Sequence, residues 1–237
     1  MKKILCFIAG GILLSCFMFK NYKIADPSTY LNDIKTELKK EWPGNRTINL
    51  VFHGHSVPSG YFKTPVVNTF GAYPYQLLKE LKAIYPYAVI NVIITAIGGE
   101  NSINGAKRFE SDVLTLKPDV IFIDYGLNDR RPGLDSAKTA WESMIKKALD
   151  KNIKVILLTP SPDLGVNILQ PDNILEKHAV QIKSLAEKYN TGFVDSYDLF
   201  RQVAANGGKL EDYMSQGNHP NEKGHTLIVN EMLKYFR

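Results

Sequence analysis

A serine and a histidine that lie far apart in this chain could form a nucleophile and its base. Ser56 follows a short apolar run, Ile48–Phe52, and His219 lies in a polar segment near the end of the chain. A serine hydroxyl becomes an effective nucleophile when a base within hydrogen-bond reach takes its proton, and N–H donors must then stabilise the oxyanion. Asn128 offers a side-chain amide, and Gly99 offers a backbone N–H that no Cβ obstructs. Together these residues predict nucleophilic hydrolysis.

Polar residues cluster at several points where apolar runs end. The clusters are His53–Ser56, Gly98–Asn101, Gly126–Asp129 and Thr159–Pro162, with a fifth, Gln216–Pro220, before the last predicted helix. Open parallel sheets bind their ligands beyond the carboxyl ends of the strands. Loops from separate parts of the chain are therefore expected to converge on one site.

The runs that precede these clusters have the composition of buried strands. Apolar stretches rich in β-branched residues occur at 48–52, 89–97, 119–125, 155–158 and 192–194. Between them, apolar residues recur at helical spacing over 77–84, 135–149 and 172–186, and a last helix is expected after Asn221. Strands that are apolar throughout and alternate with helices indicate a parallel sheet covered on both faces. The sequence therefore predicts an α/β fold.

Four sequence blocks resemble those of the SGNH hydrolases, a family of GDSL-like esterases and lipases. They are Gly54-His55-Ser56 followed by Ser59-Gly60-Tyr61, Gly99 ahead of Glu100-Asn101-Ser102, Gly126-Leu127-Asn128-Asp129, and His219-Pro220-Asn221 with Gly224-His225. The blocks occur in the family's order and span residues 50–225. One Gly-x-Asn-Asp is weak evidence, whereas four blocks on a matching alternation of strands and helices are strong evidence.

The resemblance implies a fold, a chemistry and a set of site residues. It implies a three-layer α/β/α sandwich with a flavodoxin-like, five-stranded parallel sheet, and ester hydrolysis without a metal or cofactor. It assigns the nucleophile to Ser56, the base to His219, and the oxyanion donors to Gly99, Asn128 and the Ser56 backbone. The Gly-x-Ser-x-Gly elbow of α/β-hydrolases is missing around Ser56, which disfavours that neighbouring fold. The aromatic segment 61–75 is expected to wall the pocket.

Two positions depart from the family pattern. His55 replaces the aspartate that usually precedes the nucleophile, and Gln216 stands where the family places an aspartate three residues before the catalytic histidine. Glutamine can accept a hydrogen bond and fix an imidazole tautomer, but it brings no negative charge to the imidazolium. Either Ser56 and His219 act as a dyad, or another acid such as Asp212 substitutes for the missing one.

Other kinds of site remain open from the residues alone. His53 and His55 lie two apart at a strand end and share a face, so with His219 or His225 they could bind zinc and activate a water. A non-catalytic binding module is a second alternative, with Gln216 as the sign of lost activity. Nucleotide binding is disfavoured because the first strand–helix turn carries no Gly-x-Gly-x-x-Gly.

Several further residues have less specific expectations. His225 is expected to support the last loop, and His178, in the middle of a helix, is expected at the surface or at an interface. Trp141 and its apolar neighbours are expected in the core. Asp124, near the end of the third strand, could either face the site or cap a neighbouring loop.

The first twenty residues differ from the rest of the chain. Lys2 and Lys3 precede the apolar stretch Ile4–Phe19, and the chain's two cysteines, Cys6 and Cys16, both lie in it. A basic start and a short apolar run are typical of an export signal, and the run is shorter than the roughly 20 residues of a spanning helix. Leu13-Leu14-Ser15-Cys16 resembles a lipoprotein signal. A lipid anchor, a cleaved signal and a signal anchor remain alternatives, with no other membrane contact expected.

Composition limits the partners and the organisation. The 237 residues fit one domain, divided here into a signal over 1–20, a lead-in segment over 21–46 and the hydrolase domain over 47–237. The net charge is +5, but lysines and arginines are scattered, so no nucleic-acid partner is expected. Export would place the protein in the periplasm, on the outer membrane or outside the cell, where the ester of a glycan or other polymer is the expected substrate.

Overall fold

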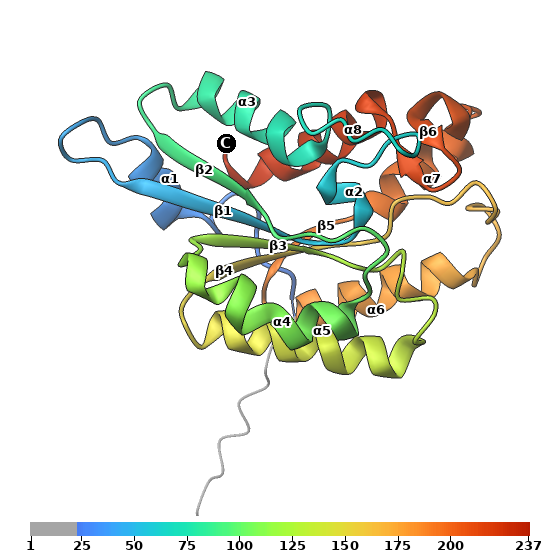
Figure 1. Ribbon diagram of the computed structural model, residues 1–237. Helices are drawn as coiled ribbons and strands as arrows, with labels where there is room; N and C mark the ends of the chain where they lie inside the picture. The colour runs from blue at the N-terminus through green and yellow to red at the C-terminus, as the bar shows by residue number, and fades with distance from the viewer. Residues whose placement is uncertain (1–22) are drawn as a thin grey trace, which may run out of the picture.

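Five parallel strands form a sheet in the order β2-β1-β3-β4-β5, as the sequence predicts (Figure 1). Their bounds are β1 Thr47–Gly54, β2 Val89–Ile94, β3 Val120–Asp124, β4 Lys154–Leu158 and β5 Gly192–Val194. The computed structural model describes residues 23–237, so the expected signal over 1–20 lies outside the described residues. The chain runs from β1 outward to β2 and then returns to β3 on the other side of β1. This reversal makes the carboxyl ends of β1 and β3 a topological switch point, where such sheets bind ligands.

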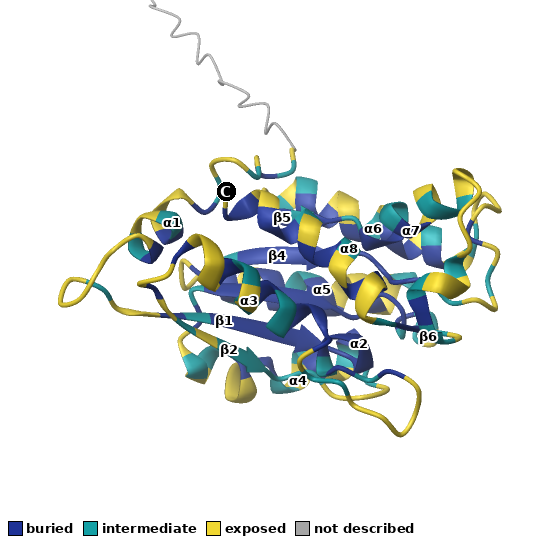
Figure 2. Cartoon of the chain, turned by 90° about the horizontal axis from the view of Figure 1, so that it is seen from above, coloured by how far each residue is buried: buried dark blue, intermediate teal, exposed yellow. Residues whose placement is uncertain are grey.

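Helices cover both faces of the sheet, which gives the expected three layers. One face carries α1 (Asn32–Leu38), α3 (Tyr73–Ile84) and α8 (Glu222–Met232), and the other carries α4 (Ser102–Asp112), α5 (Leu134–Leu149) and α6 (Ile174–Tyr189). Side chains alternate between the faces along each strand, so Leu50 and Phe52 face the first layer and Val51 faces the second. Strands β1, β3 and β4 are largely buried between the two helical layers, whereas the edge strand β2 is half-buried to exposed (Figure 2).

Several short elements complete the chain, and some of them were not expected from the sequence. They are α2 (Ser56–Ser59), α7 (Ser196–Ala205), the 3₁₀ turns Leu114–Leu116, Leu210–Tyr213 and Leu233–Tyr235, and an antiparallel pair formed by β6 (Met214–Gln216) and β7 (His219–Pro220). Helix α4 also escaped the sequence pattern, because its buried residues are only Ser102, Gly105 and Phe109. Two small residues and one aromatic do not make an apolar stripe.

The segment before β1 packs against the sheet. Leu31, Ile34 and Leu38 are buried in the first layer, and the Tyr30 hydroxyl accepts a hydrogen bond from the Val155 N–H. The Ala25 N–H donates to the Thr191 carbonyl just before β5. Among residues 23–237, no helix combines the length and the apolar character needed to cross a bilayer.

Candidate active site

Ser56 lies at the switch point, where β1 ends and α2 begins. Gly54 is required just before it, because a Cβ there would collide with the Asp124 carbonyl of β3 and the Pro58 ring. As the first residue of α2, Ser56 has a backbone N–H without an intrahelical acceptor, and no described residue accepts from it. Its side chain is largely buried, with the residue 8% exposed. The residue thus combines a hydroxyl with a backbone N–H that no described residue occupies.

His219 lies within hydrogen-bond reach of Ser56. Its Nε2 is 2.9 Å from Ser56 Oγ, although the two residues come from opposite ends of the folded chain. His219 begins β7, and the β6–β7 pair is tied to the neighbouring loop by the Leu164 N–H, which donates to the Gly217 carbonyl at 2.7 Å. The structure therefore brings together the two residues that the sequence predicts as nucleophile and base.

The other ring nitrogen of His219 has no carboxylate beside it. Nδ1 lies 2.9 Å from the Phe62 carbonyl oxygen and 2.7 Å from Nε2 of Gln216. No described carboxylate pairs with His219. The contact recorded for Asp212 in this region is through its backbone carbonyl, which accepts from the Asn221 amide. Burial lowers the pKa of His219, the Phe62 carbonyl opposes this, and the nearby His55 adds to the lowering.

Gly99 and Asn128 border the same rim. Gly99 has a φ of +77°, a conformation that favours glycine, and a Cβ built on it meets no atom within 4 Å. No described group accepts its N–H. The Asn128 amide donates to the Glu100 carbonyl at 2.9 Å, which fixes the amide plane and leaves its second N–H for a ligand. Both donors can stabilise negative charge on a bound oxygen.

A buried polar cluster supports the loop that carries Gly99. Arg108 Nε donates to Glu100 Oε1 at 2.8 Å, and the Tyr125 hydroxyl donates to Glu100 Oε2 at 2.8 Å. His53 lies 3.1 Å from the same hydroxyl and 2.9 Å from Thr95 Oγ1. Burial, with a smaller contribution from Arg108, lowers the pKa of His53 to about 4, so its ring is neutral. The sequence did not reveal this cluster, although Glu100 follows directly on the glycine.

Asp129 connects the loop that carries Asn128 to the second helical layer. Its carboxylate accepts from the Ser102 N–H at 2.8 Å and from the Trp141 indole at 2.7 Å. Burial raises the pKa of Asp129, and these two hydrogen bonds oppose the rise. Trp141 is buried, as predicted. The last residue of the Gly-x-Asn-Asp block therefore holds the start of α4 in place.

Asp124, whose orientation the sequence left open, faces the layer beneath Ser56. One carboxylate oxygen accepts from the Tyr73 hydroxyl at 3.0 Å, and the other lies 3.3 Å from Nε2 of His55. All three residues are buried. The residue that replaces the usual aspartate before the nucleophile therefore has an aspartate as its partner on the adjacent strand.

The four histidines considered as zinc ligands do not form a ligand set. Within residues 23–237, no group of three or more His, Cys, Asp or Glu side chains could hold a metal ion. His53 is bonded on the α4 side of β1, whereas His55 faces Asp124. His225 is buried and accepts from the Tyr73 N–H at 3.2 Å, a structural position like the one expected.

His178 contradicts its expectation. It was expected at the surface or an interface, but it is 1% exposed, within α6. Burial, with a smaller contribution from Arg130, lowers its pKa to about 4. His178 lies three residues after Leu175 and four before Ile182, so helical spacing places it on the buried face, and the expectation followed its polarity instead.

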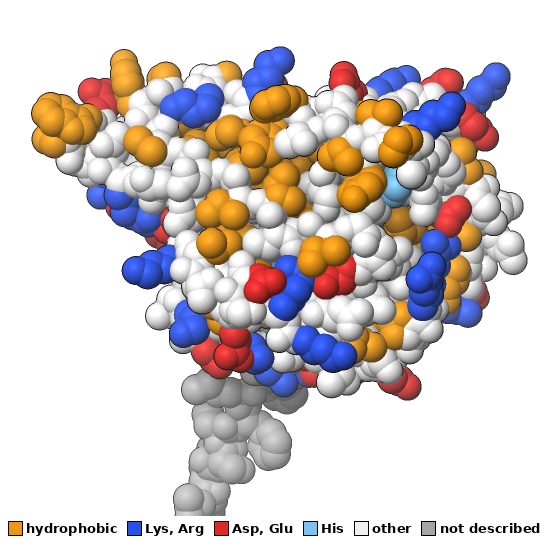
Figure 3. Space-filling model, in the orientation of Figure 1, with side chains coloured by type: hydrophobic (Ala, Val, Ile, Leu, Met, Phe, Trp, Pro, Cys, Tyr) orange, Lys and Arg blue, Asp and Glu red, His pale blue; other side chains and the backbone are white. Residues whose placement is uncertain are grey.

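Segment 61–75 was expected to wall the pocket, and its Tyr61 lies close to His219. Its ring lies 6.1 Å from the His219 ring between centroids, and a Cβ on Gly98 would come within 3.1 Å of it. Farther along the same loop, Phe70 is 80% exposed. Exposed apolar side chains also gather over α3 and the edge strand β2 (Figure 3).

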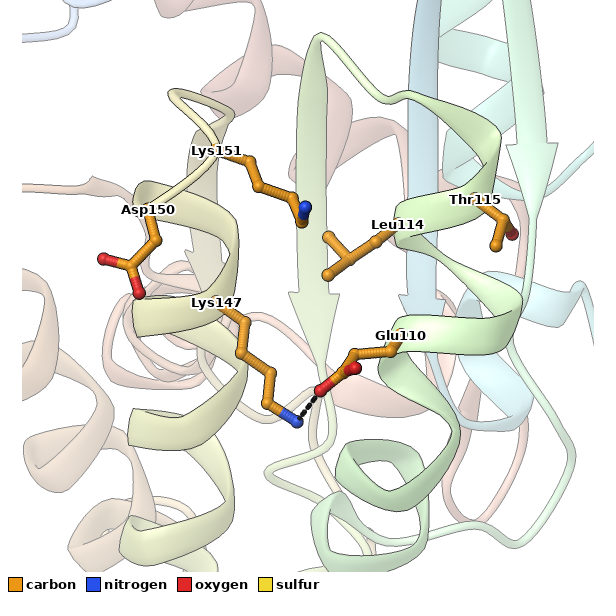
Figure 4. Close-up of a pocket in the computed structure, with 6 residues that line it drawn as sticks. All are labelled: Glu110, Leu114, Thr115, Lys147, Asp150 and Lys151. Atoms are coloured by element: carbon orange, nitrogen blue, oxygen red, sulfur yellow. Dashed lines mark ion pairs between the residues drawn. The ribbon is translucent and has the colours of Figure 1, made fainter.

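A surface pocket of about 510 Å³ lies far from Ser56 (Figure 4). It is formed where α4 and the following 3₁₀ turn face the end of α5, and Glu110 and Lys147 form an ion pair in it. These segments end just before β3 and β4 begin, so the pocket is at the amino ends of the strands. It is therefore separate from the Ser56 site.

Comparison with known proteins identifies relatives for most of the chain. The model of the GDSL-like Lipase/Acylhydrolase family matches residues 52–227. An acetylxylan esterase from Geobacillus stearothermophilus is 25% identical over 205 residues, which cover 78% of this chain and 92% of that protein. The crystal structure of an acetylxylan esterase from the same organism, Axe2, aligns with a TM-score of 0.69 at 23% identity, over 80% of this chain and 94% of that one.

A second structural neighbour has two domains. It is an esterase, CEX, active on acetylated mannans, and it aligns with a TM-score of 0.70 at 22% identity. The alignment covers 87% of this chain and 52% of that chain. At these identities the two structures establish the shared fold.

Proposed function

This chain belongs to the GDSL-like lipase/acylhydrolase family and is an ester hydrolase, and from that premise we propose that it is a serine esterase that removes O-acetyl groups from carbohydrates. The observation that carries the proposal is the 2.9 Å contact of Ser56 Oγ with His219 Nε2, beside the donors of Gly99 and Asn128. The substrate class is supported by relatives described as acting on acetylated xylan and acetylated mannans.

The proposed reaction proceeds in two halves. Ser56 Oγ attacks the acetyl carbonyl while His219 Nε2 takes its proton, and the N–H groups of Ser56, Gly99 and Asn128 stabilise the oxyanion. When the tetrahedral intermediate collapses, His219 returns the proton to the departing sugar oxygen, which leaves as a hydroxyl. Water, deprotonated by His219, then attacks the acetyl-enzyme. The bond between the acetyl carbon and Ser56 Oγ breaks, His219 returns the proton to Oγ, and acetic acid leaves and ionises to acetate. Each half requires His219 to be neutral at its start.

The nucleophile is tested by Ser56→Ala. We expect hydrolysis of an activated acetate ester to fall by several orders of magnitude, because a catalytic unit that loses one member retains little beyond oxyanion stabilisation and binding. Ser59→Ala is the matched control, since this serine lies in the same helix and its hydroxyl donates only to the His55 carbonyl. Normal turnover in Ser56→Ala, or an equal loss in both variants, contradicts the assignment.

The substrate class is tested by an ester panel with increasing acyl length that includes acetylated xylan and acetylated mannan. We expect acetyl esters to have the highest kcat/KM and acetate to be released from at least one polymer. A preference for long acyl chains, without release of acetate from either polymer, contradicts the carbohydrate proposal and leaves the ester chemistry intact.

We also propose that the chain is exported, with residues 1–20 as the signal and Cys16 as the candidate lipidation site. Lys2, Lys3 and the apolar run that follows support this. One lipid chain anchors weakly, and stable attachment takes more than one. Mass spectrometry of the mature N-terminus separates the outcomes: a lipidated Cys16 supports an anchor, a free residue at position 17 or later supports secretion, and an intact Met1 in membranes supports a signal anchor.

A further inference from the structure

The Nδ1 side of His219 raises the question of what orients this base. To accept the Ser56 proton at Nε2, the neutral ring must carry its own hydrogen on Nδ1, and an acceptor beside Nδ1 favours that tautomer. In SGNH hydrolases an aspartate has this role, and here its position holds Gln216. Two groups contact Nδ1, the Gln216 amide nitrogen and the Phe62 carbonyl oxygen.

The orientation of the Gln216 amide is set by its other contacts. Its Oε1 accepts from the Thr64 N–H at 3.0 Å, and its Nε2 lies 3.4 Å from Asn218 Oδ1. Turning the amide over would bring its NH₂ group against the Thr64 N–H, so that two donors would face each other. Gln216 therefore presents a nitrogen to His219, and this nitrogen cannot accept the Nδ1 hydrogen. With that hydrogen directed at the Phe62 carbonyl, the 2.7 Å approach of the Gln216 nitrogen is a contact without a hydrogen bond, and the amide is held by Thr64 and Asn218.

The Phe62 carbonyl is the remaining acceptor, and several contacts hold it. The Phe62 N–H donates to the Val66 carbonyl at 3.0 Å, which closes the loop around it. The Phe62 ring stacks on the His225 ring, with centroids 5.3 Å apart and planes 20° apart. Two residues farther on, Thr64 is tied to Gln216. The carbonyl is thus fixed from its own loop, from α8 and from β6.

We propose that the Phe62 carbonyl takes the place of the missing aspartate, and that Gln216 acts as a clip which holds the Phe62–Thr64 loop against His219. The proposal rests on the proposed esterase function. Phe62 and Gln216 are positioning residues, because each acts through His219. When Ser56 Oγ bonds to the acetyl carbon, its proton moves to Nε2, while the Nδ1 hydrogen stays on the ring and is donated to Phe62. No proton passes to the carbonyl.

The decisive variant is Gln216→Glu, which keeps the length of the side chain. One carboxylate oxygen can still accept from the Thr64 N–H, while the other replaces the nitrogen 2.7 Å from Nδ1. An adjacent negative charge stabilises the imidazolium and raises the histidine pKa. We expect the acid limb of kcat/KM to move upward by about one pH unit or more. The other titratable groups near His219 are His55 before α2, Tyr61 in the following loop and His225 on α8.

Asp212→Asn is the matched control, since its carboxylate has no contact with His219, and we expect an unchanged profile. NMR titration of His219 reads the same pKa change without any ester turnover, so failure of the esterase assignment is distinguishable from failure of this proposal. An unchanged His219 titration in Gln216→Glu, or a shift in Asp212→Asn, overturns the proposal.

A backbone substitution tests the carbonyl itself. Replacing Lys63 by its α-hydroxy analogue turns the Phe62 amide into an ester, whose carbonyl is a weaker acceptor, and no described residue accepts from the Lys63 N–H that is lost. We expect kcat to fall roughly 5- to 10-fold, the size of one weakened hydrogen bond, with little change in KM. A wild-type kcat in this variant overturns the proposal.

Discussion

The residues on the two sides of the proposed active site are positioned by different kinds of contact. Ser56, Gly99 and Asn128 follow strands β1, β2 and β3, and buried side chains such as Glu100 and Asp129 hold their loops. His219 instead lies on a two-strand hairpin outside the sheet, and its Nδ1 faces a backbone carbonyl and an amide. Side-chain hydrogen bonds, which a single mutation can remove, therefore hold the loops of Ser56, Gly99 and Asn128. Backbone contacts largely hold His219.

Under the proposed mechanism, this difference accounts for the loss of a family carboxylate. A carbonyl oxygen accepts the Nδ1 hydrogen as a carboxylate does, but it supplies no full negative charge. Orientation is preserved, while electrostatic stabilisation of the imidazolium is reduced. On the proposed oxyanion side, one of the donors is the side-chain amide of Asn128, which a single substitution removes. We therefore expect single side-chain substitutions to do more damage on the sheet side.

The largest effect is expected beneath the nucleophile, in the Asp124 pair. Asp124→Ala removes the partner of both His55 and Tyr73 at a buried position. A buried polar group that is left without a partner costs about 1–3 kcal/mol, and this change affects both the Tyr73 hydroxyl and the His55 ring. Urea unfolding should detect this loss, with the exposed Asp212→Ala as the matched control, expected within about 0.5 kcal/mol of wild type. Equal stability of the two variants would mean that the pair contributes little.

A slightly smaller effect is expected for Asn128→Ala. Removing one oxyanion donor typically lowers kcat by about 10²–10³, and KM should change less because the charge develops in the transition state. Steady-state kinetics on an acetyl ester measures both. Asn230→Ala, at an exposed position of α8, is the matched control. If Asn128→Ala changes KM alone, the residue binds substrate and the contrast between the two sides weakens.

The smallest effect, about 1.4 kcal/mol for each ring between pH 7.5 and 5.5, should appear in the pH dependence of the free energy of unfolding, and it involves both sides of the site. Burial lowers the pKa of His53 to about 4, and that of His225 to about 3, from an ordinary value of 6.5. Unfolding lets both rings bind protons, so the stabilisation is complete above pH 6.5. It is lost as the pH falls toward 3–4, at about 1.4 kcal/mol per pH unit for each ring. Urea unfolding at pH 7.5 and 5.5 measures this, and a flat profile would contradict it.

The sequence predicted the sheet because its strands are continuous apolar runs, and this signal does not depend on tertiary contacts. All five runs are strands, although the predicted stretch 89–97 extends past the end of β2 at Ile94. Helix α4 was missed, since Gly105 and Phe109 give it almost no apolar stripe. The convergence of Ser56 and His219 was expected because the switch point of a parallel sheet gathers loops from distant parts of the chain.

Other features of the site could not be predicted for physical reasons. The contact of His55 with Asp124 depends on the register of β1 with β3, in which Gly54 pairs with Asp124. The Phe62 carbonyl carries no residue-specific signal, because every residue has such a group. His178 was misjudged because its polar side chain outweighed its spacing, which places it on the same face of α6 as Leu175 and Ile182. The sequence thus predicts residue types at the rim, whereas the partners that orient them follow from tertiary packing.

The position of the N-terminal segment determines how the site would be oriented relative to a surface to which the chain is attached. Ala25 is bonded to Thr191 just before β5, and the Lys23 carbonyl accepts from Asn190 at the end of α6, so the described chain starts at the amino ends of the strands. Ser56 lies beyond their carboxyl ends. If the protein is attached to a membrane through the preceding residues, the point of attachment and Ser56 lie at opposite ends of the strands. Its active site then faces away from the supporting surface, where a large polymer can approach without steric conflict.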